Sequence, residues 1–302
     1  DPDTRTPSHS REVALQHMAN SIPFLQLLLL WYLGGVLCVA STKTLLMGED
    51  AISPAALSMF QFLCTILPLN YALHGHTLWR GVPLSLPKHK LQDDKAKKLT
   101  MCALFYSTGF VLTSVSFYTS SASFTETIKS SEPITSTLVA LYFSVSPVSS
   151  GEFLGILLII LGVSSTVHDA SSSHTPSILT STPNPTLSLM ITLVSNLCFS
   201  FRNVYQTILK KEMRNFNTFR FFHGMCQLSL LLMFPIFLFH LPKSLCPISA
   251  LPLLCVNGLS HCFYNLCSAI ILSRVSMIDH SMFNCLRRLG AILVSNFWFG
   301  VG

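Results

Sequence analysis

Charged side chains are scarce in this sequence. Asp, Glu, Lys and Arg together make up 11% of its 302 residues, and 50% of the residues are hydrophobic. A soluble globular domain carries roughly 25% charged residues, because its surface is covered by groups that water solvates. The composition therefore excludes an ordinary water-soluble domain and indicates a protein whose main solvent is the lipid bilayer.

The motifs of nucleotide-driven and hydrolytic chemistry are missing as well. The sequence contains no Walker loop, no dinucleotide-binding fingerprint and no nucleophile elbow. Each of these motifs supplies a phosphate cradle or an activated nucleophile. We therefore expect neither an ATP-driven pump nor a hydrolase. The chain is predicted not to be an enzyme and to use no cofactor, so any transport would be secondary.

The ten cysteines lack the spacing of a metal site. Zinc ligands recur as pairs that are about two to four residues apart. Most of the cysteines here, including Cys38, Cys64, Cys198 and Cys267, fall inside apolar runs. We interpret them as small core residues and predict neither a metal site nor a disulfide framework.

Long hydrophobic runs dominate what is present. A transmembrane helix needs roughly 20 consecutive, mostly apolar residues, and nine stretches of this kind occur between charged, Pro-rich or polar segments. They cover residues 22–46, 54–74, 99–119, 121–143, 152–168, 186–209, 218–240, 249–272 and 278–300. The predicted fold class is an all-α membrane protein with about nine transmembrane helices.

The basic residues of the loops indicate the orientation. With the amino end in the cytosol, thirteen of them lie on that side: Arg5, Arg11, Arg80, Lys88, Lys90, Lys95, Lys97, Lys98, Lys210, Lys211, Arg214, Arg220 and Arg274. The opposite side holds only Lys43 and Lys243, as the positive-inside rule predicts. A net charge of +6 then reflects loops that face anionic lipid, so we infer no nucleic-acid partner.

Four basic residues fall inside the predicted spans: Lys129, Arg202, Arg287 and Arg288. Each lies about 12–14 Å from a helix end at 1.5 Å per residue. A cation near the bilayer centre costs about 2.5–3.5 kcal/mol to insert, and such residues usually face a cavity or a partner. We therefore predict that the four cations share a site near the middle of the membrane.

The protein's own carboxylates could neutralise part of this charge. Glu126 and Glu132 lie three residues on either side of Lys129, which is the spacing at which helical side chains meet. One reading is that they form structural ion pairs with Lys129. Four cations and two carboxylates still leave two positive charges, which a dianion such as a phosphate ester would balance. Arginine would supply paired hydrogen-bond donors, and lysine a compact charge.

Three motifs carry a resemblance to a known family. They are FYTSSASFTETIKSSEP at 117–133, SFRNVY with KKEM at 200–213, and HCFYNLCSAIILSRVSMIDHSMFNCLRR at 261–288. Their content and order resemble the triose-phosphate translocator family, which comprises sugar-phosphate/phosphate translocators and belongs to the drug/metabolite transporter superfamily. The chain is identified as a member of that family on these three stretches.

The resemblance implies a ten-helix bundle of two inverted five-helix repeats with substrate bound between them. It divides the chain into a cytosolic N-terminal segment (1–21), a first repeat (22–168), a Ser/Thr/Pro-rich linker loop (169–185) and a second repeat (186–302). The second repeat lacks the family's tenth helix, so we expect a chain that is incomplete at its C-terminus.

The resemblance also implies roles for single residues. Lys129, Arg287 and Arg288, with Thr113 as a hydrogen-bond donor, would hold the phosphate end of a substrate. Tyr264 and Arg202 would reach toward its other end. The implied partners are a phosphorylated small molecule, inorganic phosphate and the lipid bilayer, and the oligomeric state stays open. The implied activity is the exchange of a sugar phosphate or similar metabolite for phosphate across an organelle membrane, of the plastid envelope or the Golgi/ER.

The chain departs from the family pattern at three places. Phe110 stands where the triose-phosphate carriers have His, Glu126 stands where plastid members have His, and Arg287-Arg288 replaces the usual Lys-Arg pair. These departures keep the positive charge but leave the substrate open. Two alternatives also stay open: a nucleotide-sugar transporter of the same superfamily, and a truncated membrane protein that does not transport.

Overall fold

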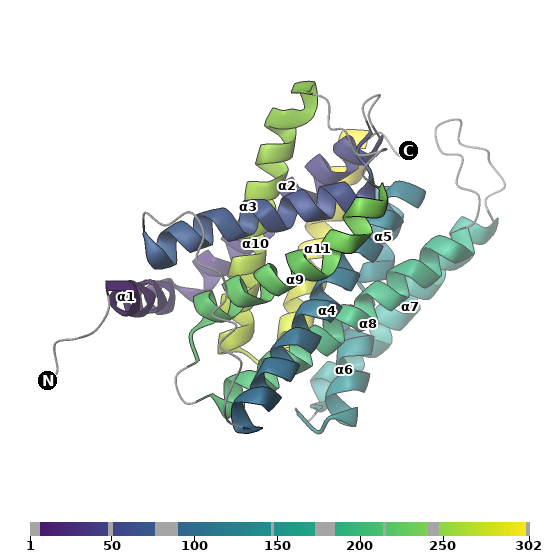
Figure 1. Cartoon of the computed structure of the whole chain (residues 1–302). Coiled ribbons are helices and arrows are strands. Elements are labelled where there is room, and N and C mark those ends of the chain that lie inside the picture. Colours follow the sequence, from purple (N-terminus) through teal and green to yellow (C-terminus); the bar gives the residue numbers. More distant parts are fainter. Residues whose placement is uncertain are drawn as a thin grey trace, which may run out of the picture.

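A computed structural model describes residues 7–47, 51–75, 90–145, 148–172, 185–213, 216–240 and 248–299 of the chain. Figure 1 shows these residues as a bundle of helices, with α1 at its edge. The elements are α1 (Pro7–Ser21), α2 (Phe24–Met47), α3 (Pro54–His74), α4 (Lys90–Thr119), α5 (Ala122–Lys129), α6 (Glu132–Tyr142), α7 (Ser150–Ser172), α8 (Pro185–Glu212), α9 (Thr218–His240), the 3₁₀ turn η2 (Ile248–Ala250), α10 (Leu251–Arg274) and α11 (Met277–Phe299).

Each predicted span coincides with one helix or with a pair of helices. Among the described residues, six helices (α2, α3, α4, α8, α9 and α10) contain stretches that are long and apolar enough to cross a membrane. In α7, the apolar part is the shorter stretch Ser150–Ser165. The span predicted at 278–300 coincides with α11, which carries Arg287 and Arg288 near its middle. The chain is thus an all-α, multi-pass membrane protein, as its hydrophobic runs predicted.

The span predicted at 121–143 is two short helices rather than one. Helix α5 ends at Lys129, and α6 begins at Glu132 with Pro133 in its first turn. Proline has no backbone N–H and its ring clashes with the preceding turn of a helix, so the helix breaks before it. The side-chain amide of Asn196 compensates for the break by donating to the carbonyl oxygens of Ile128 (3.2 Å) and Lys129 (3.4 Å).

Two of the predicted segments contain helical residues. The predicted linker at 169–185 is helical at its first four residues, because α7 continues to Ser172, while residues 173–184 lie outside the described part of the chain. The predicted N-terminal segment contains helix α1, whose sequence has no periodic apolar pattern that would indicate a helix. The division into two repeats remains a prediction.

Lys43 is not a loop residue. It lies in α2 with 5% of its surface exposed, and its Nζ donates to the carbonyl oxygens of Phe117 (2.7 Å) and Ser120 (2.6 Å) at the end of α4. Helix C-termini carry unpaired carbonyls and partial negative charge, which a lysine stabilises. Lys43 is therefore a fifth buried cation, compensated by backbone carbonyls, and the outer loops hold one basic residue fewer than predicted.

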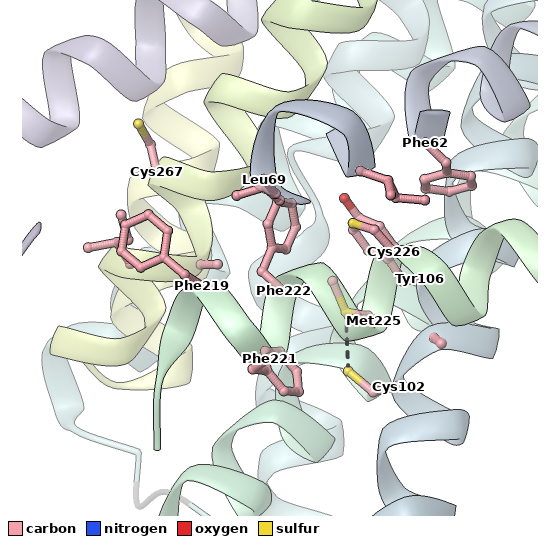
Figure 2. Packing of buried hydrophobic residues seen from close by; sticks show 14 of the residues in the cluster. Phe62, Leu69, Cys102, Tyr106, Phe219, Phe221, Phe222, Met225, Cys226 and Cys267 are labelled. Atoms are coloured by element: carbon pink, nitrogen blue, oxygen red, sulfur yellow. Dashed lines mark hydrogen bonds between the residues drawn. The ribbon is translucent and has the colours of Figure 1, made fainter. Parts of the chain in front are cut away.

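The most extensive helix contacts join α4 to α8, α2 to α10 and α3 to α9. A large apolar cluster fills the space between α3, α4 and α9. Figure 2 shows Phe62, Tyr106, Phe222 and Met225 in this cluster, with Cys102 Sγ 3.6 Å from Met225 Sδ. Three buried cysteines belong to it (Cys102, Cys226 and Cys267), as the interpretation of cysteines as core residues predicted. This apolar packing fixes α4 as one wall of the polar cavity described next.

Candidate functional site

One cavity in the bundle collects all six residues predicted to bind substrate: Thr113, Lys129, Arg202, Tyr264, Arg287 and Arg288. They come from α4, α5, α8, α10 and α11, so helices from both halves of the chain build its wall. The centres of water molecules can occupy a volume of about 80 Å³ in this cavity. On the same measure, a single water needs roughly 10–15 Å³. The cavity has room for a small polar ligand.

Lys129 is held by hydroxyl groups rather than by a carboxylate. Only 4% of its surface is exposed, and its Nζ donates to Thr113 Oγ1 (2.7 Å) and Ser195 Oγ (3.4 Å). The same Nζ lies 4.7 Å from the centre of the Phe199 ring, which adds a cation–π contact. No carboxylate forms an ion pair with Lys129 among the described residues.

Arg288 is the cation that holds both carboxylates. Its Nη1 lies 3.4 Å from Glu126 Oε2, and its Nη2 forms a short ion pair with Glu132 Oε2. All three side chains are almost completely buried. The reading in which these glutamates neutralise Lys129 is therefore wrong. Glu126 lies one turn before Lys129 on α5, but the helix break places Glu132 on α6, and the planar fork of Arg288 from α11 contacts both carboxylates.

Arg287 faces the same cavity from α11 without an acidic partner among the described residues. Its Nε donates to Asn284 Oδ1 (2.9 Å), and its Cζ lies 5.6 Å from the centre of the Tyr264 ring. Asn284 in turn donates its amide to Glu132 Oε2 (2.6 Å). One amide side chain therefore orients Arg287 and joins it to the Arg288–Glu132 pair.

Arg202 has spare hydrogen-bonding capacity. Its Nη1 donates to Asn203 Oδ1 (2.8 Å), and its Cζ lies 5.2 Å from the centre of the Tyr106 ring. Its Nε and Nη2 are buried and have no hydrogen-bond partner. Buried donors without partners are rare, because each costs about 1–3 kcal/mol. These two donors are therefore candidates for ligand contacts.

The charges that line the cavity do not cancel. Four cations (Lys129, Arg202, Arg287 and Arg288) face two carboxylates (Glu126 and Glu132), which leaves a formal charge of +2 with histidines counted as neutral. A buried excess charge is unfavourable because the low-dielectric interior solvates it poorly. The arrangement can therefore be completed by an anion of two negative charges, bound by ammonium, guanidinium and hydroxyl donors.

Comparisons with known proteins give two matches. The model of the triose-phosphate transporter family matches residues 22–301. The chain belongs to this family. A similar protein is phosphoenolpyruvate/phosphate translocator 3, chloroplastic, of Oryza sativa subsp. japonica, which is 28% identical over 287 residues. The match covers 89% of this chain and 66% of the rice protein, so the chain spans just under two thirds of that relative's length.

The sequence alone did not indicate several polar residues that lie in or beside the cavity. Ser195 and Asn284 support the cations, while His261 and His280 line the cavity and each keeps one ring nitrogen without a hydrogen-bond partner. Neutral polar residues occur at many positions of transmembrane helices, so their type alone does not mark a site. Phe110 lines the cavity too, 4.7 Å from His261 between ring centres.

Proposed function

We propose that this chain is a secondary transporter that exchanges a phosphorylated small metabolite for inorganic phosphate across an organelle membrane. The observation that carries the proposal is a buried cavity with two uncompensated positive charges inside a multi-pass bundle. A phosphate or phosphate monoester carries about two negative charges at neutral pH. The name of the rice relative supports phosphate exchange and a plastid membrane. The Golgi and ER remain alternative locations.

The proposed binding mode places the phosphate group between Lys129, Thr113, Arg287 and Arg288. Lys129 and Thr113 are already in hydrogen-bond contact, so they form one end of a donor set that can converge on phosphate oxygens. Arg202 and Tyr264 would contact the remainder of the metabolite, with the two unpartnered donors of Arg202 available for its hydroxyl or carbonyl oxygens. Charge-assisted bonds of this kind are about twice as strong as neutral ones.

The pattern of helix contacts supports the proposed pair of inverted repeats. Suppose that α2, α3 and α4 of the first repeat correspond to α8, α9 and α10 of the second. Exchanging the two repeats then converts the α4–α8 contact into the α10–α2 contact and leaves the α3–α9 contact unchanged. These are the three most extensive contacts between helices. The proposed site lies between the repeats, where rocking of one repeat against the other would expose it to each side in turn.

The size of the cavity favours a small phosphate ester over a nucleotide sugar. Drug-sized ligands occupy pockets of roughly 300–1,000 Å³, and a nucleotide sugar would need further space for its base. The present cavity, of about 80 Å³, lies below that range, and its charge of +2 matches the two negative charges of a phosphate monoester. We therefore rank the nucleotide-sugar alternative second.

Exchange in proteoliposomes tests the proposed function. Vesicles containing the purified chain and internal phosphate are expected to take up labelled phosphate, and unlabelled sugar phosphates in the external medium are expected to compete for uptake. Competition by nucleotide sugars alone would favour the second candidate. If no anion is taken up above the level of protein-free vesicles, this chain does not transport on its own.

Gly35 offers a test of the site that removes no charge. A Cβ atom at this position would lie 2.6 Å from Arg287 Nη1 and 2.8 Å from its Cδ. Because a flexible side chain rather than backbone occupies this space, Gly35→Ala should fold and displace the guanidinium group. We expect the KM for phosphate to rise about tenfold, which corresponds to one charge-assisted hydrogen bond.

The matched control is Gly151→Ala, because a Cβ atom there meets nothing within 4 Å. Exchange kinetics and the yield of folded protein should equal those of the wild type. A Gly35→Ala variant with an unchanged KM would show that the position of Arg287 does not matter for phosphate binding.

A further inference from the structure

Glu126 is the surplus carboxylate of the cavity. Glu132 is held by two partners, since Arg288 Nη2 and Asn284 Nδ2 both donate to its Oε2. Glu126 makes a single, longer contact of 3.4 Å with Arg288 Nη1, although its surface is only 1% exposed. Arg288 would keep one buried counter-ion without it. The fold therefore does not require a second carboxylate at this arginine.

Glu126 also faces the region where a ligand would lie. It stands three residues before Lys129 on α5, so both side chains project from the same face of the helix. Both line the cavity. The backbone around Glu126 is fixed, because the Ser130 N–H donates to its carbonyl oxygen at 3.0 Å. Its carboxyl group is thus held beside the proposed phosphate position.

We propose that Glu126 determines which phosphate esters the carrier accepts, by selecting dianions whose remainder is neutral and rejecting trianions that carry an additional carboxylate. This inference rests on the proposed function. With Glu126 present, the cavity charge of +2 balances a phosphate monoester and no more. A third negative charge on the ligand would have no cation to balance it and would lie in low dielectric near the Glu126 carboxylate.

Removing the charge of Glu126 while keeping its shape should reverse this selection. In Glu126→Gln the formal cavity charge becomes +3, and a glutamine side chain still offers an oxygen to Arg288 Nη1. Arg288 also retains its contact with Glu132, so the helices should remain in place. The variant is therefore expected to gain the third positive charge that a phosphorylated carboxylic acid needs.

The test compares two ligands of nearly equal shape. Glycerol 3-phosphate ends in a neutral CH₂OH group where 3-phosphoglycerate ends in a carboxylate, and at pH 8 both phosphate groups are dianions, because their second pKa is about 6. The rate of uptake of each labelled ester is measured against internal phosphate in proteoliposomes. We expect the wild type to prefer glycerol 3-phosphate at least tenfold, and Glu126→Gln to shift the ratio at least tenfold toward 3-phosphoglycerate.

The control is Glu152→Gln, which removes the same charge at the start of α7, where the carboxylate accepts from the Ser149 N–H. Its ratio should equal that of the wild type. A wild type that prefers 3-phosphoglycerate, or a folded Glu126→Gln variant with an unchanged ratio, overturns the role of Glu126 while leaving phosphate exchange intact. A wild type that exchanges phosphate for neither ester overturns the inference, and one that exchanges no phosphate at all overturns the proposed function as well. If Glu126→Gln does not fold, the wild-type preference decides the question.

Discussion

Arg287→Ala is expected to reduce phosphate exchange at least 100-fold while leaving most of the protein folded. The substitution lowers the cavity charge from +2 to +1 and removes a planar donor group that can bind two phosphate oxygens. Two charge-assisted hydrogen bonds contribute about 3–6 kcal/mol in total. Because Arg287 has no carboxylate partner among the described residues, its loss leaves no buried acid unpaired.

The measurement is the initial rate of labelled phosphate uptake, normalised to the folded protein recovered in the vesicles. Arg287→Lys should lose less activity, since lysine keeps the charge and loses only the fork geometry. Arg220→Ala serves as the matched control, because Arg220 is largely exposed and lies 3.9 Å from its acidic neighbour. Full exchange by Arg287→Ala would remove this residue from the proposed site.

Arg288 provides an informative contrast with its neighbour. Removing Arg288 would leave Glu126 and Glu132 as buried carboxylates without their cation. Removing one partner of a buried ion pair lowers the free energy of unfolding by about 3–5 kcal/mol. We therefore expect Arg288→Ala to reduce the yield of folded protein as well as exchange, unlike Arg287→Ala. Of these two adjacent arginines, Arg288 is thus expected to matter for folding as well as for exchange, and Arg287 mainly for exchange.

A second large effect is expected in vesicles that contain no internal phosphate. Without an anion, the cavity holds two uncompensated positive charges that approach one another when the two repeats close around the site. At about 5–8 Å and an effective dielectric constant near 20, their repulsion is about 2–3 kcal/mol. The empty carrier should therefore change conformation roughly 30- to 150-fold more slowly than the loaded one.

Uptake of a labelled ester into vesicles with and without internal phosphate measures this effect. Rapid uptake only into loaded vesicles is the expected result, because a bound dianion cancels the repulsion and stabilises the closed conformations. Equal initial rates in both preparations would mean that the buried cations do not restrain the empty carrier. Glu126→Gln should strengthen the dependence on internal phosphate, since it raises the cavity charge further.

The sequence by itself determined the membrane class, the positions of the spans and the four cations within them. These properties are local: a hydrophobic run is visible without a partner, and a charge inside such a run is conspicuous because its insertion is costly. Pro133 is also visible in the sequence, but the mean hydropathy of a stretch as long as a span hides the effect of a single proline. Lys43 was misplaced because its position near the end of α2 does not reveal the carbonyl oxygens it meets.

Only the tertiary structure decided which carboxylate pairs with which cation. Glu126 and Lys129 are neighbours on α5, yet Glu126 contacts Arg288, which is 162 positions away in the chain. Pairing of this kind depends on the packing of α11 against α5 and α6, which places the planar guanidinium group of Arg288 between Glu126 on α5 and Glu132 on α6. Lys129 is thereby left to hydroxyl oxygens, and the excess positive charge lies where a phosphate can reach it.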